Sequence, residues 1–515
     1  GIDILGQVAQ VDQRTGLSEE ELIGIIGEYD GLMIRSGTQV TAAVIAAASR
    51  LKIIGRAGVG VDNVDVPAAT QRGVLVVNSP EGNTIAAAEH ALAMMLTLSR
   101  HIPQAHGGMR AGKWDRKKYV GNELYKKTLG VVGLGKIGSH VARVAQAMGM
   151  EVIAYDPFIA ADRAQRMQVK LLELDELFRT ADYVTLHIPR TKDTENLVNA
   201  ELLRTMKPTA RIVNCARGGV VDEAAIAEAI NNGVIAGAGL DVYASEPLAE
   251  DSPLRAVERG LVLTPHLGAS TEEAQENVAI DVAEQIRDVL LGLPARSAVN
   301  IPGLSAEIME RLKPHLQLAE TVGLLVSQLA GGHVKEMELR LQGEFASHPS
   351  QPLVIAALKG LLSAGLGDSI NFVNASLEAK ARGIQVLEVK DESSRDFAGG
   401  SLQITTRGDQ GSRSVTGAVF ADGDLRITSI DAFPVNVTPS SHMLFTRHRD
   451  MPGIIGHLGS LLGEHNVNIA SMQVGRKIVR GDAVMVLSID DPIPADLLQT
   501  ITAIDGIQEA HPVTL

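Results

Sequence analysis

Three side chains of complementary chemistry follow one another along the chain: Arg217 in NCARGG, Glu246 in LDVYASEP and His266 in TPHLGAS. Oxidation of a 2-hydroxy acid by hydride transfer needs a base for the hydroxyl proton, a cation for the carboxylate and developing carbonyl, and a carboxylate that orients the base. An imidazole titrates near neutral pH and suits the first role, a guanidinium suits the second, and Glu246 suits the third by favouring the imidazolium. Singly, each residue also has an ordinary interpretation as a strand-end cap, a surface ion pair or a turn residue.

The segment LGVVGLGKIGSHVARVAQAMGMEVIAYDP (129–157) precedes these residues and has the glycine spacing of a dinucleotide fingerprint. The glycines of such a fingerprint permit a tight turn, a close approach of backbone to pyrophosphate and close helix packing, and pyrophosphate then meets the positive end of the helix. Asp156 can accept hydrogen bonds from both ribose hydroxyls and would repel a 2′-phosphate, which favours NAD over NADP. The alternative makes Asp156 a turn residue before Pro157.

The elements that would position these residues alternate in type over the first 300 residues. Short apolar runs that end in Gly, Ser or Asn alternate with helical stretches, and this alternation predicts a doubly wound parallel sheet. We expect helices at 41–50 and 84–100, a basic loop at 112–128, and strands at 31–37, 51–58, 73–79, 151–156, 183–189, 211–219, 235–243 and 261–268. Ligands bind at the carboxyl ends of strands in such sheets.

The pattern changes after residue 294. PARSAVNIPG lacks periodicity and predicts a linker. HVKEMELRLQGEF and SRSVTGAVFADGDLRITSID then indicate antiparallel strands, with Asp422 and Gly423 in a turn. Residues 304–438 carry no chemical signature, and residues 443–515 follow a βαββαβ order.

Composition excludes several classes of protein. The chain has 515 residues, 45% of them apolar, which predicts about three domains of roughly 150 residues. Its net charge of -14, without a long basic run, argues against nucleic acid as a partner. We expect no membrane span, and no metal site because no His/Asp/Glu cluster has ligand spacing. The single cysteine, Cys215, predicts a reducing compartment, the cytoplasm or an organelle interior if a targeting segment was removed.

GRAGVGVDNVD, GLGKIG, NCARGGVVDE, LDVYASEP and PHLGAST resemble the motifs of the D-isomer-specific 2-hydroxyacid dehydrogenases, and the whole chain resembles the long phosphoglycerate dehydrogenase branch of that family. The resemblance implies a Rossmann-type NAD domain (89–267) inserted in a flavodoxin-like substrate domain (1–88 and 268–300). An α+β intervening allosteric substrate-binding domain (304–438) and a ferredoxin-like ACT domain (443–515) would follow. Helices 84–100 and 271–291 would form the hinge, and the family's usual first strand is missing.

The resemblance also implies an activity: oxidation of D-3-phosphoglycerate to 3-phosphohydroxypyruvate with NAD, the first step of L-serine biosynthesis. Arg217, Glu246 and His266 would be catalytic. The implied NAD contacts are Gly133, Gly135, Lys136, Ile137, Gly138, Asp156, His187, Cys215, Ala216, Asp241 and Gly268. The implied substrate contacts are Arg35, Ser36, Arg56, Val59, Gly60, Asn83 and Arg116. Residues 112–118, with Lys117 and Lys118, could instead form a solvated basic loop, and Cys215 is interpreted as a small packing residue.

In the tail, LFTRHRDMPGIIGHLGSLLGEHNVNIASMQVGR has the order of an ACT module. The resemblance implies that His448, Asp450 and Asn468 bind L-serine across a dimer interface within a homotetramer, whereas the alternative is a plain dimerisation domain. Two alternatives to the activity remain: a dehydrogenase for glycerate, lactate or another D-2-hydroxy acid, and an NAD-sensing corepressor. The tail argues against the corepressor, since those proteins lack an ACT module.

Overall fold

The computed structural model describes residues 1–302, 306–392, 400–420 and 423–515. Its contacts divide the chain into two compact units, one of residues 1–11, 56–61 and 78–284 and the other of residues 12–55, 62–77 and 285–515. Each unit is described on its own. Asp422, expected in a turn, and residue 304, an expected domain boundary, lie outside the described ranges.

The first unit is built on a seven-stranded parallel sheet with the order β10-β9-β8-β7-β4-β5-β6. Its strands are β4 (Thr128–Val132), β5 (Glu151–Tyr155), β6 (Lys170–Leu171), β7 (Tyr183–Leu186), β8 (Arg211–Asn214), β9 (Gly237–Leu240) and β10 (Leu261–Leu263). β7, β8 and β9 are buried along their whole length, which explains their largely apolar sequences. The strand order reverses between β4 and β7, where ligands bind in doubly wound sheets.

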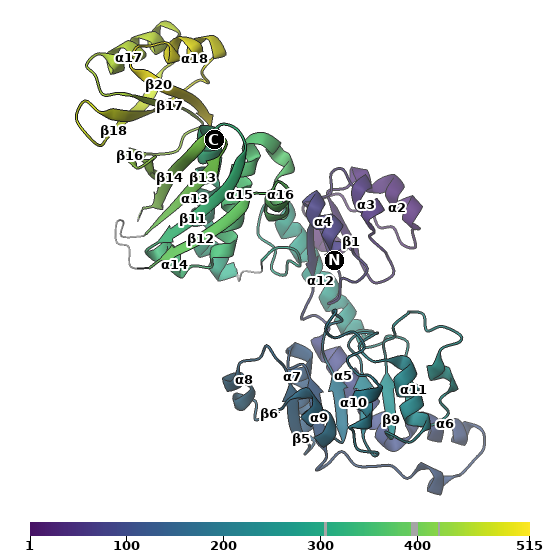
Figure 1. The fold of residues 1–515 in the computed structure, drawn as a ribbon. Coiled ribbons are helices and arrows are strands. Elements are labelled where there is room, and N and C mark those ends of the chain that lie inside the picture. Colours follow the sequence, from purple (N-terminus) through teal and green to yellow (C-terminus); the bar gives the residue numbers. More distant parts are fainter. Residues whose placement is uncertain (303–305, 393–399, 421–422) are drawn as a thin grey trace. The chain divides into compact units, whose positions relative to one another are not determined.

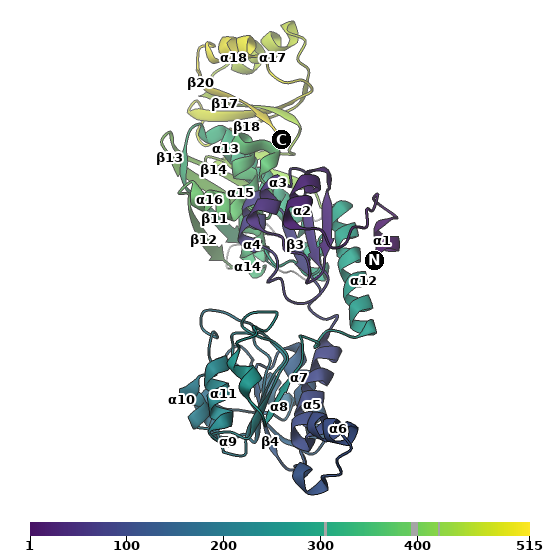
Figure 2. The same cartoon turned by 90° about the vertical axis from the view of Figure 1, so that its right-hand side faces the viewer.

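Helices cover both faces of this sheet (Figure 2). α5 (Thr84–Arg100) and α7 (Lys136–Ala147) lie on one side, and α9 (Leu174–Thr180), α10 (Ala200–Arg204) and α11 (Glu223–Asn231) lie on the other. The buried face of α5 is rich in alanine, which lets the helix pack closely on β8 and β9. Shorter elements are α1 (Ile2–Leu5), α6 (Ile102–Arg110), η2 (Arg116–Tyr119), α8 (Ala161–Arg166) and η3 (Pro253–Ala256).

A three-stranded sheet begins the second unit, with the order β1 (Gly31–Ile34), β2 (Ile53–Arg56), β3 (Leu75–Asn78). Its helices are α2 (Glu19–Ile25), with the short η1 (Ile26–Glu28) after it, α3 (Ala42–Ala47) and α4 (Val66–Arg72). Residues 1–30, all described, form helices and loops without a strand. The chain returns to this sheet after α12 (Glu272–Leu290): Ala298 bridges Val77, and the side chain of Asn300 accepts a 2.9 Å bond from the Val76 N–H.

A six-stranded sheet follows, in the order β12-β11-β13-β14-β15-β16. Its strands are β11 (Val334–Gln342), β12 (Gln385–Asp391), β13 (Ser401–Gly408), β14 (Gly411–Val419), β15 (Leu425–Ile430) and β16 (Phe433–Val437), and all neighbours are antiparallel except β11 and β12. Two long helices, α13 (Ala306–Ala330) and α15 (Ser350–Leu366), pack on each other, and α13 also packs on the sheet. α14 (Glu344–Ser347), η4 (Gly367–Ser369) and α16 (Ala375–Ala381) complete this part.

The C-terminal part has the predicted βαββαβ order: β17 (His442–Arg449), α17 (Ile454–Glu464), β18 (Ile469–Arg476), β19 (Asp482–Ile489), α18 (Ala495–Thr502) and β20 (Ile507–Thr514). The antiparallel sheet order is β18-β19-β17-β20, and both helices cover one face (Figure 1). Leu444, Leu458 and Ile501 belong to its core. With the other sheets, this arrangement confirms the predicted fold class.

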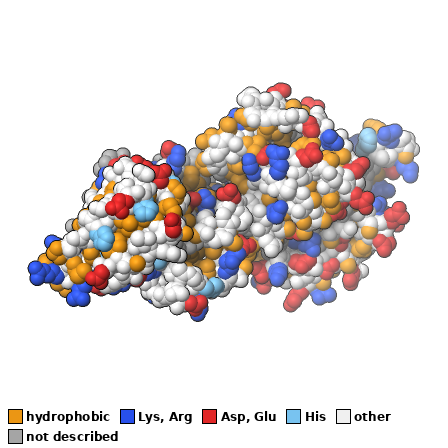
Figure 3. All heavy atoms as spheres, turned by 90° about the horizontal axis from the view of Figure 1, so that it is seen from above, with side chains coloured by type: hydrophobic (Ala, Val, Ile, Leu, Met, Phe, Trp, Pro, Cys, Tyr) orange, Lys and Arg blue, Asp and Glu red, His pale blue; other side chains and the backbone are white. Residues whose placement is uncertain are grey.

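The surface mixes charges of both signs. In the face shown in Figure 3, Lys and Arg side chains alternate with Asp and Glu and with apolar groups. Among the described residues, no helix is both long and apolar enough to span a membrane.

Candidate active site

Parallel strands place the predicted residues along a single edge of the seven-stranded sheet. Gly133 follows β4, Asp156 follows β5, His187 follows β7, and the segments of Arg217, Glu246 and His266 follow β8, β9 and β10. Because the carboxyl ends of parallel strands meet at one edge, segments far apart in sequence meet there.

The fingerprint loop has the shape that a pyrophosphate requires. Gly133 is left-handed (φ 93°) and lies against the backbone of His187, and Gly138 is so close to the carbonyl of Gly133 that a Cβ would collide with it. At Gly135 a Cβ would meet nothing within 4 Å, which leaves the backbone open just before α7 begins. Lys136, at the start of α7, pairs with Glu81. The loop therefore fits the diphosphate of a dinucleotide.

Asp156 is fixed by the backbone around it. Its carboxylate accepts bonds from the N–H groups of Leu134 (2.8 Å), Phe158 (2.9 Å) and Ile159 (3.1 Å). The Leu134 bond ties the carboxylate to the fingerprint loop, while the other two make Asp156 the turn residue of the alternative interpretation. The two interpretations are therefore compatible.

His266 and Glu246 form a direct pair. The Nδ1 atom of His266 lies 2.7 Å from Oε2 of Glu246, and Oε1 of Glu246 accepts a 3.1 Å bond from the Tyr243 N–H. The pair uses Nδ1, so Nε2 is the ring atom left to exchange a proton with a substrate. His266 has a left-handed backbone (φ 55°), and its side chain is 50% exposed. A histidine, an orienting carboxylate and access to solvent are thus combined.

The loop of Arg217 is held by a buried amide. Asn214 Oδ1 accepts a bond from the Ala216 N–H, and Asn214 Nδ2 donates to the Arg217 carbonyl, both at 3.0 Å. The neighbouring Gly218 contacts the backbone of Tyr243, the residue that bonds to Glu246. The loops that carry Arg217 and Glu246 therefore touch each other.

Asp241 directly follows β9 and is completely buried. Its Oδ1 accepts bonds from Thr264 Oγ1 (2.6 Å) and the Leu267 N–H (2.7 Å), and its Oδ2 accepts a bond from the Gly268 N–H (2.8 Å). Desolvation acts to raise the pKa of Asp241, but hydrogen bonds from His90, Thr264 and Leu267 outweigh it and lower that pKa. Gly268, expected near the cofactor, is thus bound to another residue of the expected cofactor set.

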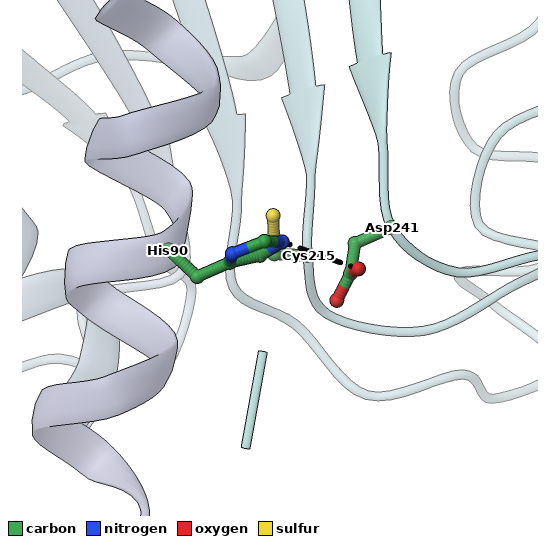
Figure 4. Close-up of side chains that lie close together, drawn as sticks. All are labelled: His90, Cys215 and Asp241. Carbon is green, nitrogen blue, oxygen red and sulfur yellow. Dashed lines mark ion pairs between the residues drawn. The ribbon is translucent and has the colours of Figure 1, made fainter. Parts of the chain in front are cut away.

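His90 is a residue of this edge that sequence reasoning missed. It projects from α5 toward Asp241 and Cys215 (Figure 4), and its Nε2 lies 3.2 Å from Asp241 Oδ1. A signal was present, because the helical period places His90 on the same face as the buried Ala86 and Met94. A polar residue on a buried helix face needs a partner.

Ligand atoms of His90, Cys215 and Asp241 lie within 4.8 Å of one another, a grouping that could hold a metal ion. Their bonding favours another interpretation, because the imidazole already faces the carboxylate at hydrogen-bond distance. Burial, with the charge of Asp241, raises the pKa of the Cys215 thiol, so the thiolate that a metal requires is disfavoured. Burial also lowers the pKa of the nearby His187 to about 4. His187 Nε2 lies 3.0 Å from Thr185 Oγ1.

The expected substrate contacts fall in both units. Arg56, Val59, Gly60, Asn83 and Arg116 belong to the first unit, and Arg35 and Ser36 belong to the second. Arg56 Nη1 donates to the Ala57 carbonyl at 3.3 Å, and its guanidinium lies against Gly58. The Oδ1 atom of Asn83 is buried without a hydrogen-bond partner among the described residues. Arg116 is exposed on η2.

The expected serine contacts are separated within one chain. His448 is buried, and burial lowers its pKa. Asp450 follows the end of β17 that pairs with Asp482, whereas Asn468 precedes the end of β18 that pairs with Ile489, at the other end of β19. Asp450 accepts a 2.9 Å bond from Arg476, and Asn468 donates a 2.7 Å bond to Asp490. One chain therefore does not bring Asp450 and Asn468 to a common ligand.

Comparison with known proteins agrees with this fold. Residues 92–268 match the D-isomer specific 2-hydroxyacid dehydrogenase NAD binding domain, which confirms the predicted cofactor class and enzyme class. Residues 311–431 match the D-3-phosphoglycerate dehydrogenase intervening domain, and residues 442–506 match the ACT domain. A Thermus thermophilus crystal structure is 35% identical, with a TM-score of 0.54 over 58% of this chain and 96% of its own.

Relatives that match over the whole chain identify a family within the 2-hydroxyacid dehydrogenases. A Synechocystis D-3-phosphoglycerate dehydrogenase is 64% identical over 100% of this chain and 93% of its own length. An Archaeoglobus fulgidus D-3-phosphoglycerate dehydrogenase is 44% identical over 98% of this chain and 96% of its own length. The chain belongs to the D-3-phosphoglycerate dehydrogenase family, as its motifs predicted.

Proposed function

We propose that this chain oxidises D-3-phosphoglycerate to 3-phosphohydroxypyruvate with NAD, the first step of L-serine biosynthesis. The observation that carries the proposal is the 2.7 Å pair of His266 and Glu246, located at the same sheet edge as the fingerprint loop. We infer the substrate from the names of the full-length relatives.

Each catalytic residue has one task in this reaction. NAD, when bound, supplies the acceptor for the hydride that leaves C2 of the substrate. Nε2 of His266 takes the proton of the C2 hydroxyl, and Glu246 stabilises the imidazolium through Nδ1. The guanidinium of Arg217 binds the carboxylate and the oxygen that becomes the carbonyl. In the reverse direction, the same imidazolium returns the proton.

Recognition of the phosphate is assigned to cationic side chains. Arg35, Arg56 and Arg116 supply planar guanidinium groups that can bind a phosphate bidentately. Backbone N–H groups of residues 57–61 and the unsatisfied Oδ1 of Asn83 supply further contacts to the substrate. An unphosphorylated hydroxy acid would make little use of these cations.

We assign residues 1–88 and 268–300 to the substrate domain and residues 89–267 to the NAD domain. The bridge between Val77 and Ala298, with the Asn300 bonds to Val76, supports a substrate domain built from two segments. Residues 304–438 form the intervening domain, to which we assign binding of an anionic effector. A cavity of about 590 Å³ supports an effector site shared with residues 443–515, since Arg413 and Asp431 of this domain and Arg447, Lys477 and Asp482 of the C-terminal domain line it.

Residues 443–515 form the regulatory domain, to which we assign L-serine as effector. His448, Asp450 and Asn468 would bind it across a dimer interface of a homotetramer. Asp450 and Asn468 lie at opposite ends of β19 within one chain, which supports a serine site formed by two chains. Asp450 of one chain and Asn468 of a second chain would then contact the same ligand.

A coupled assay tests the activity. Purified chain is assayed with NAD against phosphorylated and unphosphorylated 2-hydroxy acids, and with 3-phosphohydroxypyruvate plus NADH in reverse. We expect highest kcat/KM with 3-phosphoglycerate. His266→Ala should lower kcat about 100-fold or more, the usual scale for general acid–base catalysis, while NADH binding stays within a few fold. Tight NADH binding without turnover by the wild type would indicate a sensor instead, and preference for glycerate or lactate would reject the substrate.

A further inference from the structure

His90 contacts the catalytic segment from outside it. The residue lies in the first half of α5, and its Nε2 is 3.2 Å from both Asp241 Oδ1 and Thr264 Oγ1. Its side chain is only 19% exposed, and Asp241 is fully buried. A bond to a buried carboxylate is stronger than one in water, because little solvent competes for it.

Asp241 in turn holds the segment that carries His266. Its carboxylate accepts bonds from the N–H groups of Leu267 and Gly268, and its backbone carbonyl accepts a 2.8 Å bond from the His266 N–H. These contacts fix three consecutive residues to the end of β9. The left-handed backbone of His266 needs such support, since that conformation is unfavourable for a residue with a side chain.

We propose that His90 is a positioning residue for the dehydrogenase reaction: its Nε2–H orients the Asp241 carboxylate, which fixes the 266–268 segment and keeps His266 in register with Glu246. This inference rests on the proposed catalytic role of His266. His90 itself touches none of the reacting groups named above.

The hydrogen bonds to the Asp241 carboxylate support a positioning role for His90 over a metal site. Oδ1 of Asp241 accepts from Thr264, Leu267 and His90, and Oδ2 accepts from Gly268, so protein donors engage both oxygens of the carboxylate. Loss of the His90 donor would remove one contact to Oδ1 and let the carboxylate rotate. Rotation would disturb both backbone bonds to the 266–268 segment.

Two amide variants test the role of the donor. His90→Gln places an amide N–H at the reach of Nε2, whereas His90→Asn is too short and places its amide near the Nδ1 position. We expect His90→Asn to lower kcat about tenfold, equivalent to about 1.4 kcal/mol, with the KM for 3-phosphoglycerate within about threefold. We expect His90→Gln to recover most of the loss. Thermal midpoints of both variants report whether folding is intact.

Thr264→Val provides an independent readout, because it removes the other side-chain donor to Asp241 Oδ1. The double variant with His90→Asn should lose less than the product of the two single losses, as expected for residues that act through one carboxylate. Equal losses in His90→Gln and His90→Asn, or wild-type kcat in His90→Asn, would overturn the inference. Normal turnover in His266→Ala would instead reject the proposed catalytic mechanism, so its failure can be told apart from a failure of the His90 inference.

Discussion

Gly218 and Tyr243 touch through their backbones, so closely that a Cβ on Gly218 would collide with the Tyr243 carbonyl group. Gly218 follows Arg217 directly, and the Tyr243 N–H binds the carboxylate of Glu246. This contact fixes the distance between the loop of Arg217, the proposed carboxylate-binding cation, and the loop of Glu246, the proposed orienting acid. Only glycine permits it.

Gly218→Ala should therefore lower kcat/KM at least tenfold. The added Cβ would meet backbone atoms of Tyr243, so a side-chain rotation cannot relieve the collision and the two loops must move apart. Steady-state kinetics with 3-phosphoglycerate measures the effect. Gly24→Ala in α2 is the matched control, since a Cβ there meets nothing within 4 Å, and it should leave kinetics unchanged. Wild-type kinetics in Gly218→Ala would show that the loops tolerate separation.

Asp156→Ala should weaken NAD binding and relax the rejection of NADP, because the variant lacks the carboxylate proposed to bind the ribose hydroxyls and to repel a 2′-phosphate. The three backbone bonds to Asp156 are lost as well, so Asp156→Asn is the control that keeps one acceptor without the charge. Fluorescence titration with NADH and NADPH gives both affinities. An unchanged ratio in both variants would place ribose recognition elsewhere.

Arg56→Ala should raise the KM for 3-phosphoglycerate about 30-fold, equivalent to about 2 kcal/mol for a charge-assisted contact, with a smaller effect on glycerate. Arg50→Ala is a suitable control, because Arg50 forms an exposed ion pair with Asp30, and such pairs contribute little. Equal losses on phosphorylated and unphosphorylated substrates would make Arg56 a structural residue.

Millimolar L-serine should inhibit the full chain, and Asn468→Ala or Asp450→Ala should abolish inhibition without changing basal kcat. A coupling free energy of about 1–3 kcal/mol corresponds to an effect of about 5- to 150-fold. Asp496→Ala, at the exposed start of α18, is the control and should remain inhibited. The regulatory assignment would be wrong if calorimetry on the intact protein detected no serine binding and serine left the rate unchanged. The domain would then serve only in assembly.

Stability of the nucleotide-binding part should fall as the pH drops from about 6.5, the ordinary histidine pKa, toward 4. Burial lowers the pKa of His187 to about 4, so over this range the unfolded chain binds a proton that the folded chain does not. The stability is complete above the ordinary pKa and is lost as the pH falls. The difference in thermal midpoint between wild type and His187→Gln should be smaller at pH 5 than at pH 7.5. An equal difference at both pH values would assign the acid sensitivity to other groups.

The sequence by itself determined the elements whose signals are local. The fingerprint glycines, the alternation of apolar runs with helices and the βαββαβ tail depend on neighbouring residues, and their elements lie within a few residues of the predicted positions. The sheet edge that gathers Arg217, Glu246 and His266 also followed, because parallel strands must share an edge. Short elements without a period, such as β6 with two residues and α6 after the left-handed His101, gave no such signal.

Tertiary structure alone decided the contacts between segments distant in the chain. No spacing rule connects His90 in a helix with Asp241 at a strand end, or Gly218 with the carbonyl of Tyr243. Packing of the fold determines these contacts. A polar group that is removed from water must form its hydrogen bonds with whichever donor or acceptor the packing places beside it. The antiparallel register likewise decided that Asp450 and Asn468 lie at opposite ends of β19, since strand pairing, not sequence distance, sets how far apart they are.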